Sequence, residues 1–395
     1  MENLTFSEWN IPEYRRLFTT VIVPPSETRV QEMCNAFATI LLGRRLFAFN
    51  MARTALMEAL RIFHRARPHA GEVIVPSYIC PAVIEAVHAT GLRPVACDVG
   101  LDLNIDVGAI EGLISSRTLA VLVAHMYGCP ARITEIAAIC QRYGVFLVDD
   151  AAQAPGISIA DQPLGTFGDV GLISFSQSKS IVTGCRNAGG LLIVNNSQFE
   201  KQAAAAYEDL PPSPPCIPDL MTFFWNYRWA QWTEIPSYYF ARVFRASRWF
   251  SNLKPKTASR MSDVVAAIAL EQHKTLQTRI AGRRRIVELY NRKIDSQRAI
   301  AFPQFGPGRY LTRIMLTIPL GADAMKVRHD LARKGICTRR GYPVYSSSTE
   351  PCPKTAWAIS PRLIEVPSCS TMSAETVDRI CCALNKSITD AALRE

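Results

Sequence analysis

The sequence lacks the cysteine and histidine patterns that bind metals or build disulfide frameworks. None of its 12 cysteines forms a Cys-x-x-Cys pair, and its six histidines show no metal-ligand spacing. Several of the cysteines lie inside apolar runs. In a chain of this length, the pattern favours buried, reduced thiols in a reducing compartment, and we expect no metal site.

Long apolar runs and a secretory leader are also missing. The N-terminal sequence MENLTFSEWNIPEYRR carries acidic residues and has no apolar core of the kind found in signal peptides. No uninterrupted apolar run reaches the ~18 residues that a membrane-spanning helix requires. We therefore expect a cytoplasmic protein.

Composition and charge set broad limits on the class of protein. The chain has 395 residues, which is long enough for two domains or for one large domain with a smaller appendage. With 48% hydrophobic and 20% charged residues, its composition is ordinary for a globular protein. Its net charge of +10 fits nucleic acid, an anionic substrate or an anionic membrane surface. Because neither end carries a helix-turn-helix pattern, we expect no nucleic-acid partner.

The region from 72 to 195 alternates between apolar strand-like segments and helix-like segments. The alternation predicts a mostly parallel sheet with helices on its faces. Ligands of such sheets bind outside the carboxyl ends of the strands, so polar residues there are candidates for the site. The predicted strands are 72–76, 94–99, 119–125, 145–150, 169–176 and 190–195, and the predicted helices are 81–90, 107–114 and 134–143.

The rest of the chain divides into further segments around this large domain, which we place at 41–204. We expect a helical N-terminal segment at 1–40, a linking helix at 257–295 and a small α+β domain at 296–395. Between them, 205–256 is an insertion with a proline-rich start, and it holds four of the six tryptophans. Three interpretations of 205–255 stay open: a structural arm that buries its aromatics, a lid over a bulky substrate, or a peripheral membrane contact.

Four local features fall at the ends of the predicted elements. Asp149 and Asp150 end a buried strand, where a carboxylate requires a cationic partner, unless one of them is a helix N-cap. Lys179 follows another strand among small hydroxyl residues and could form a Schiff base if its pKa is lowered; the alternative is an exposed loop lysine. The segment 50–56 opens a helix whose free N–H groups suit a phosphate, and 184–190 is a glycine-rich turn.

Taken together, the order of these features resembles the DegT/StrS-type aminotransferases. These are pyridoxal-phosphate enzymes of fold type I, which mostly aminate nucleotide-linked keto sugars. The similarity covers about 40–200 and about 257–385. It rests on the segments VIVPSY, RPVACDV, AVLVAHMYGCP, VFLVDDAAQA, GTFGDVGLISFSQSK, NAGGLLIV, SRMSDVVAAIAL and GICTRRGYPVY.

The resemblance implies roles for individual residues. Lys179 matches the lysine that holds the cofactor, and Asp150 matches the aspartate that pairs with the pyridinium nitrogen. Gln153 matches the contact to the phenolic oxygen of the ring. The remaining implied cofactor contacts are Ser174, Arg53 and Thr54 at the phosphate, and Cys80 at the ring-stacking position, where Tyr78 could take over.

The sequence also departs from the family pattern. Ala258 replaces an asparagine that reaches the phosphate of the partner subunit, although Arg260 and Met261 remain. Ser346 and Ser347 stand where a histidine is often found, and the insertion is longer than the usual connection. These departures bear on the contact between subunits and on the substrate.

The resemblance therefore predicts a pyridoxal 5'-phosphate-dependent aminotransferase that acts as a homodimer. The expected amino donor is an amino acid such as glutamate, and the expected acceptor is an anionic carbonyl compound, a nucleotide-linked keto sugar. Two alternatives stay open. One is elimination or dehydration, or other chemistry of the same cofactor on a non-sugar substrate. The other is a non-catalytic cofactor-binding regulator or membrane-associated module.

Overall fold

The computed structural model describes residues 8–9, 11–22, 27–176, 179–185, 187–212, 257–294, 312–347 and 351–392. Most of the predicted insertion, 213–256, lies outside these ranges, as do Gln177, Ser178 and Arg186.

The larger part of the molecule is built on a seven-stranded sheet with the order β1-β9-β8-β5-β4-β2-β3. Its inner strands pair in parallel, whereas β9 runs antiparallel to both β8 and β1. The strands are β1 Arg45–Phe49, β2 Glu72–Pro76, β3 Arg93–Cys97, β4 Thr118–Ala124, β5 Phe146–Asp150, β8 Val170–Ser174 and β9 Gly190–Val194. The six predicted strands are all present; β1 is an addition, and its sole neighbour in the sheet is β9.

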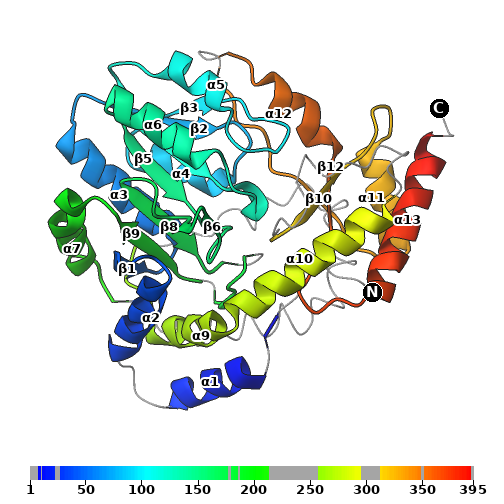
Figure 1. The fold of residues 1–395 in the computed structure, drawn as a ribbon, viewed down its shortest axis with the longest axis horizontal. Helices are drawn as coiled ribbons and strands as arrows, with labels where there is room; N and C mark the ends of the chain where they lie inside the picture. Colours follow the sequence, from blue (N-terminus) through cyan, green and yellow to red (C-terminus); the bar gives the residue numbers. More distant parts are fainter. Residues whose placement is uncertain are drawn as a thin grey trace.

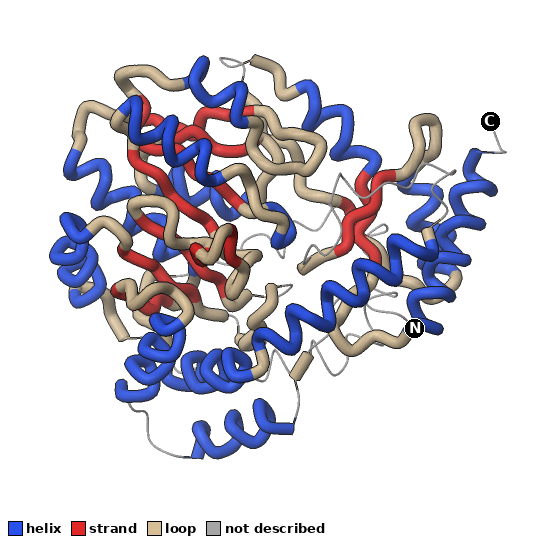
Figure 2. Tube along the Cα trace, in the orientation of Figure 1, coloured by secondary structure: helices blue, strands red, loops and turns tan. Residues whose placement is uncertain are grey.

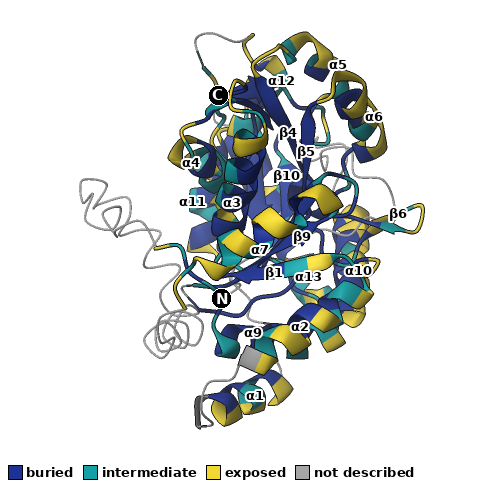
Figure 3. Ribbon diagram, turned by 90° about the vertical axis from the view of Figure 1, so that its left-hand side faces the viewer, coloured by how far each residue is buried: buried dark blue, intermediate teal, exposed yellow. Residues whose placement is uncertain are grey.

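Helices cover both faces of this sheet, which is why its strands are continuous apolar runs (Figures 1 and 3). One face packs against α3 Ala52–Ala66, α4 Pro81–Ala89 and α7 Glu200–Glu208. The other packs against α2 Glu27–Thr39, α5 Val107–Ile110, α6 Ile133–Tyr143 and α9 Asp263–Lys274. Alternate residues of each strand point to the two faces, so Val148 contacts the first layer and Leu147 the second.

A smaller unit follows, with its own antiparallel sheet in the order β10-β12-β11 (Figure 2). The long helix α10 Leu276–Lys293 leads from the large sheet to this unit (Figure 1). The elements of the smaller unit are β10 Ile314–Thr317, α11 Ala324–Arg333, β11 Arg339–Arg340, α12 Lys354–Ile359, β12 Leu363–Val366 and α13 Ala374–Ala392. The architecture is therefore α/β with a mainly parallel sheet and a smaller C-terminal α+β unit, as the sequence predicted.

The remaining elements are short or peripheral. They are α1 Ile11–Ile22, the hairpin strands β6 Ser158–Ile159 and β7 Gln162–Pro163, and the 3-10 turns Glu111–Leu113, Met126–Gly128, Ser197–Phe199 and Ser360–Arg362. Among the helices described, none has both the length and the apolar character needed to cross a membrane.

Candidate active site

Two adjacent aspartates end β5, and their surroundings differ. Asp149 is completely buried, and its Oδ2 accepts hydrogen bonds from the N–H groups of Gly165 at 2.7 Å and Phe167 at 3.0 Å. Its Oδ1 lies 2.7 Å from His125 Nε2. Because His125 Nδ1 accepts from Ala131 N–H, the proton of the neutral ring is on Nε2 and is donated to Asp149. Asp149 is therefore fully engaged by the protein itself.

Asp150 points to the opposite face of the strand and retains accepting capacity. It is buried, and from the described residues its carboxylate accepts a single hydrogen bond, from Ala152 N–H to Oδ1 at 2.9 Å. Burial raises its pKa, against the opposing positive charge of Lys179. No helix begins after either aspartate in the described chain, so the alternative that one of them is a helix N-cap is wrong.

Lys179 lies beyond the end of β8 and is partly buried, so the alternative of an exposed loop lysine is also wrong. Its pKa is lowered to about 8, chiefly by burial and then by the positive charge of Arg313. Cys80 and Asp150 act in the opposite direction. The structure thus brings together three residues predicted from sequence, Lys179, Asp150 and Cys80, with one that the sequence analysis missed.

The predicted phosphate contacts meet at the start of α3. Ser174 pairs with Gly190 across β8 and β9, and a Cβ placed on Gly190 would lie 2.2 Å from Ala52 N, at the first residue of α3. The Ser174 Oγ atom lies 3.0 Å from Ser176 Oγ. The close approach of strand and helix requires a glycine at position 190. As at the start of any helix, the N–H groups of the first turn have no intrahelical acceptors and can bind an anion.

Arg53 and Thr54, which follow Ala52 in α3, have side chains that are engaged within the protein. The Arg53 guanidinium is directed to Glu85, with Nη1 2.8 Å from Oε2, and the side chain is 42% exposed. Thr54 Oγ1 donates to Asn50 Oδ1 at 2.8 Å. Both side chains therefore have partners within the protein, which agrees with a role for their N–H groups in holding an anion.

Gln153 carries an unused polar group. Its side chain is buried; within the described ranges its Nε2 reaches only Met126 Sδ, at 3.8 Å, and its Oε1 has no hydrogen-bond partner. A thioether is a weak acceptor, and a buried amide without good partners costs free energy. The amide is thus available to a ligand.

Tyr78 and Cys80, the two candidates for stacking on a cofactor ring, differ in accessibility. Tyr78 is completely buried, and its hydroxyl lies 2.7 Å from Tyr127 Oη and accepts from Tyr342 N–H at 3.0 Å. Burial raises its pKa to about 12. Tyr78 therefore joins the two structural units, whereas Cys80, at the N-cap of α4, is partly exposed.

Arg313, immediately before β10, was missed because nothing in its sequence surroundings marks a site. Its Nη1 lies 3.5 Å from Glu365 Oε2, and its guanidinium lies 5.6 Å from the centre of the Tyr342 ring. Burial disfavours its charge, but Glu365, with smaller contributions from neighbouring phenols and a thiol, raises its pKa above the ordinary value.

Arg260, one of the family positions that the sequence retains, is engaged by backbone carbonyls. Its Nε donates to Leu210 O at 3.0 Å and its Nη2 to Glu208 O at 3.1 Å. Within the described residues it ties the segment after α7 to the segment before α9.

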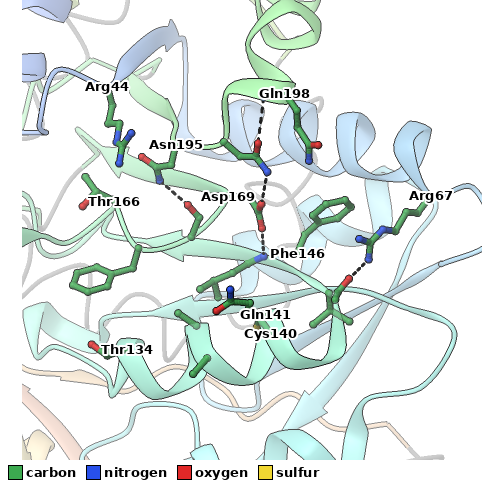
Figure 4. Close-up of a pocket in the computed structure, with 18 residues that line it drawn as sticks. Arg44, Arg67, Thr134, Cys140, Gln141, Phe146, Thr166, Asp169, Asn195 and Gln198 are labelled. Carbon is green, nitrogen blue, oxygen red and sulfur yellow. Dashed lines mark hydrogen bonds between the residues drawn. The ribbon is translucent and has the colours of Figure 1, made fainter.

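A separate hollow of about 650 Å³ lies at the other end of β5, around Phe146 (Figure 4). None of the residues predicted for the site lines it. Asp169 in its wall accepts from Leu147 N–H and from Asn196 Nδ2, and Arg67 donates to Gly144 O, so its polar walls are largely engaged in the fold. The candidate active site is therefore at the carboxyl ends of the strands, as expected for a parallel sheet.

The chain belongs to the DegT/DnrJ/EryC1/StrS aminotransferase family, whose model matches residues 26–385. This confirms the predicted family. It is 37% identical over 149 residues to UDP-N-acetyl-3-dehydro-α-D-glucosamine 3-aminotransferase of Acidithiobacillus ferrooxidans, an alignment that covers 38% of this chain and only 39% of that relative. It is 25% identical over 333 residues to GDP-perosamine synthase of Escherichia coli O157:H7, covering 81% of this chain and 79% of that one.

The fold is shared with solved structures. The aminotransferase PseC of Helicobacter pylori, involved in the biosynthesis of pseudoaminic acid, superimposes with a TM-score of 0.78 at 16% identity, over 98% of this chain and 99% of that one. At this identity the likeness concerns the fold, and it confirms the predicted fold type I architecture.

Proposed function

We propose that this protein is a pyridoxal 5'-phosphate-dependent aminotransferase. It would move an amino group from an amino acid, glutamate, to the carbonyl group of a nucleotide-linked keto sugar. The observation that carries the proposal is Lys179, whose pKa is lowered to about 8, placed with Asp150 and Cys80 at the carboxyl end of the sheet. The family of the chain and the sugar-linked names of its relatives support the acceptor class.

The residues present fit the cofactor. The buried Asp150 carboxylate has accepting capacity left for a cationic ring nitrogen, and the amide of Gln153 suits an oxygen on the ring. Ser174 and the start of α3 suit a phosphate. When bound, pyridoxal phosphate supplies an electron sink that stabilises negative charge on the carbon next to the amino nitrogen.

The protein side chains would divide the remaining work. Lys179 holds the cofactor. As a neutral amine, it takes the proton from the donor carbon and then gives that proton to a different atom. Asp150 keeps the ring nitrogen protonated. Over the whole reaction the amino acid becomes a 2-oxo acid and the acceptor carbonyl becomes a primary amine, so no outside oxidant or reductant is required.

We further infer a homodimer in the cytoplasm. The dimer is proposed from the family resemblance. The location is supported by the free thiols, because most of the described cysteines are buried and none is paired in a disulfide.

Reduction with borohydride tests the lysine assignment directly. The wild-type protein mixed with pyridoxal phosphate should give a stable adduct on the peptide that contains Lys179, seen by mass spectrometry. Lys179→Ala should give none, whereas Lys201→Ala, which removes an exposed lysine on α7, should keep it. An adduct that persists in Lys179→Ala would show the assignment to be wrong.

Absorption spectroscopy tests the reaction. The visible band of the cofactor-loaded protein should bleach on addition of L-glutamate or another amino acid. If the band forms and no amino acid changes it, aminotransferase activity is contradicted and elimination chemistry becomes the better proposal.

A further inference from the structure

Arg313 has a position that the proposed cofactor chemistry leaves unexplained. It directly precedes β10, and the N–H of its neighbour Thr312 donates to Tyr127 O at 2.7 Å, in the loop that follows β4. The start of β10 is thereby fastened to the carboxyl edge of the large sheet, where β5 ends in Asp150. The smaller unit thus delivers a guanidinium to the edge at which Lys179 lies.

The guanidinium of Arg313 has donors that lack an acceptor in the described part of the chain. Its nearest anionic partner is Glu365, at 3.5 Å from Nη1, which is longer than a normal hydrogen bond. Among the residues that the structure describes, Arg313 Nε is buried and has no acceptor, and Glu365 Oε2 has no donor. A guanidinium with unused donors, kept mostly out of water, is costly unless an acceptor arrives from outside the chain.

Neighbouring side chains hold the guanidinium in one orientation. The Nη1 end faces Glu365, which is only 4% exposed on β12, and the Tyr342 ring lies 5.6 Å from the guanidinium carbon. Tyr342 is itself fixed, because its N–H donates to the hydroxyl of the buried Tyr78 at 3.0 Å. The edge that carries Nε is left for a planar anion, and carboxylates match this fork with two parallel hydrogen bonds.

The chemistry of the two substrates decides which of them this cation serves. In an amino acid, the carboxylate is attached to the same carbon as the amino group, so it lies close to Lys179 when that nitrogen reacts. In a nucleotide-linked sugar, the diphosphate is separated from the reacting carbonyl carbon by part of the sugar ring. A cation near Lys179 is therefore placed for the α-carboxylate of the donor rather than for the diphosphate of the acceptor.

We propose that Arg313 binds the α-carboxylate of the amino donor through its Nε edge, with Glu365 and Tyr342 as positioning residues. This inference rests on the proposed function. The positive charge of Arg313 also helps to keep the Lys179 amine neutral, so one side chain would serve both binding and reactivity.

Kinetics of the donor half-reaction test the proposal. Arg313→Met removes the cation at similar volume, and Arg333→Met is its control, because Arg333 is an exposed arginine at the end of α11 in the same unit. Both variants should retain the cofactor band. We expect the half-saturating L-glutamate concentration to rise roughly 10- to 150-fold in Arg313→Met and to stay unchanged in Arg333→Met. Propylamine has no carboxylate, so its half-saturating concentration should be the same in wild type and both variants, even where the altered pKa of Lys179 changes its rate.

Ligand binding gives a readout that does not depend on turnover. The cofactor-loaded wild type and Arg333→Met should gain thermal stability with 2-oxoglutarate, whereas Arg313→Met should gain little. If Arg313→Met does not load cofactor, Arg313→Lys replaces it in the test, since it keeps the charge and loses the paired donors of the guanidinium. In Arg313→Lys, the half-saturating concentration of glutamate should rise less than in Arg313→Met, and that of propylamine should not rise.

The outcomes separate the two proposals. A wild-type protein that reacts with L-glutamate, together with an Arg313 variant whose glutamate dependence and thermal shift are unchanged, would overturn the role of Arg313 alone. A wild-type protein whose band responds to no amino acid would overturn the proposed function, and the inference with it.

Discussion

At the scale of single residues, the alternation of side chains along a strand gives Asp149 and Asp150 different surroundings. Successive side chains of β5 point to opposite faces of the sheet. Asp149 is directed to the layer of α6 and α9, where two backbone N–H groups and His125 surround its carboxylate. Asp150 is directed to the face covered by α3, which is also the face of Ser174. A carboxylate enclosed by donors is structural, and one with free oxygen lone pairs can serve a ligand.

The two aspartates should therefore respond differently to the same substitution. Asp149→Asn places an N–H₂ group or a neutral oxygen against buried donors, and we expect it to lower the free energy of unfolding by about 2–4 kcal/mol in urea titrations. Asp150→Asn should cost less than ~1 kcal/mol but reduce turnover at least ~100-fold. Equal losses of stability in both variants would contradict this division.

The lowered pKa of Lys179 predicts a specific pH dependence. An amine reacts when neutral, so the rate at which cofactor-free protein captures pyridoxal phosphate should rise with pH through about 8 and level off above it. With an unperturbed lysine, the capture rate would keep rising towards pH ~10.4. Because the charge of Arg313 lowers this pKa, Arg313→Met should shift the profile to higher pH, and an unshifted profile would contradict the coupling.

At the scale of elements, the contact between β9 and α3 builds the proposed phosphate site. Gly190 is paired with Ser174 on one side and touches the first residue of α3 on the other. Any side chain there would push the start of the helix away from the strand, because backbone atoms cannot give way as a flexible side chain can. The position of the start of α3 thus depends on Gly190, a residue without a side chain.

We expect Gly190→Ala to weaken both the fold and cofactor binding. The added Cβ would lie 2.2 Å from Ala52 N, and such overpacking costs about 1–3 kcal/mol. Gly112→Ala is the matched control, since a Cβ there meets nothing within 4 Å. Urea unfolding and titration with pyridoxal phosphate measure the two effects. If Gly190→Ala binds the cofactor as tightly as Gly112→Ala, the proposed phosphate site is misplaced.

At the scale of the whole molecule, the proposed active site is assembled from two units. Lys179 and Asp150 come from the large sheet, and Arg313 and Tyr342 come from the smaller unit, which α10 connects to it (Figure 1). The cluster of the buried Tyr78 and Tyr127 with the partly buried Tyr342 fastens the units together beside the proposed site. A change in this cluster should therefore affect the donor site without any contact to the donor.

The proposed homodimer is tested by mass in solution. The chain has a mass of 43.8 kDa, so light scattering should give 2 × 43.8 = 87.6 kDa for the cofactor-loaded protein. Dilution that dissociates the dimer should reduce turnover if the partner completes the site. A monomer with full turnover would contradict the proposal.

Much of the large domain could be predicted from local sequence. Strands buried on both faces must be continuous apolar runs, and the helices between them carry recognisable starts and stops. Residues that end such strands, among them Asp150 and Ser174, are therefore identifiable along with Lys179. The strand β1 was not predicted, because it is a strand through its pairing with β9. Counted from Arg45 to Gly190, β9 begins 145 residues after β1.

The sequence by itself determined the α/β class, the family and the residues at the carboxyl ends of the strands, because burial and backbone preference act over short stretches of chain. Only the tertiary structure decided which aspartate is engaged by the protein, that the Tyr78 hydroxyl is already bonded, and that the charge of Arg313 acts on Lys179. These facts depend on packing between segments that are not adjacent in the chain: Asp149 and its partners are 16 to 24 residues apart, and Tyr78 and Tyr342 are 264 residues apart. Separation along the chain therefore does not set the distance between two groups in space.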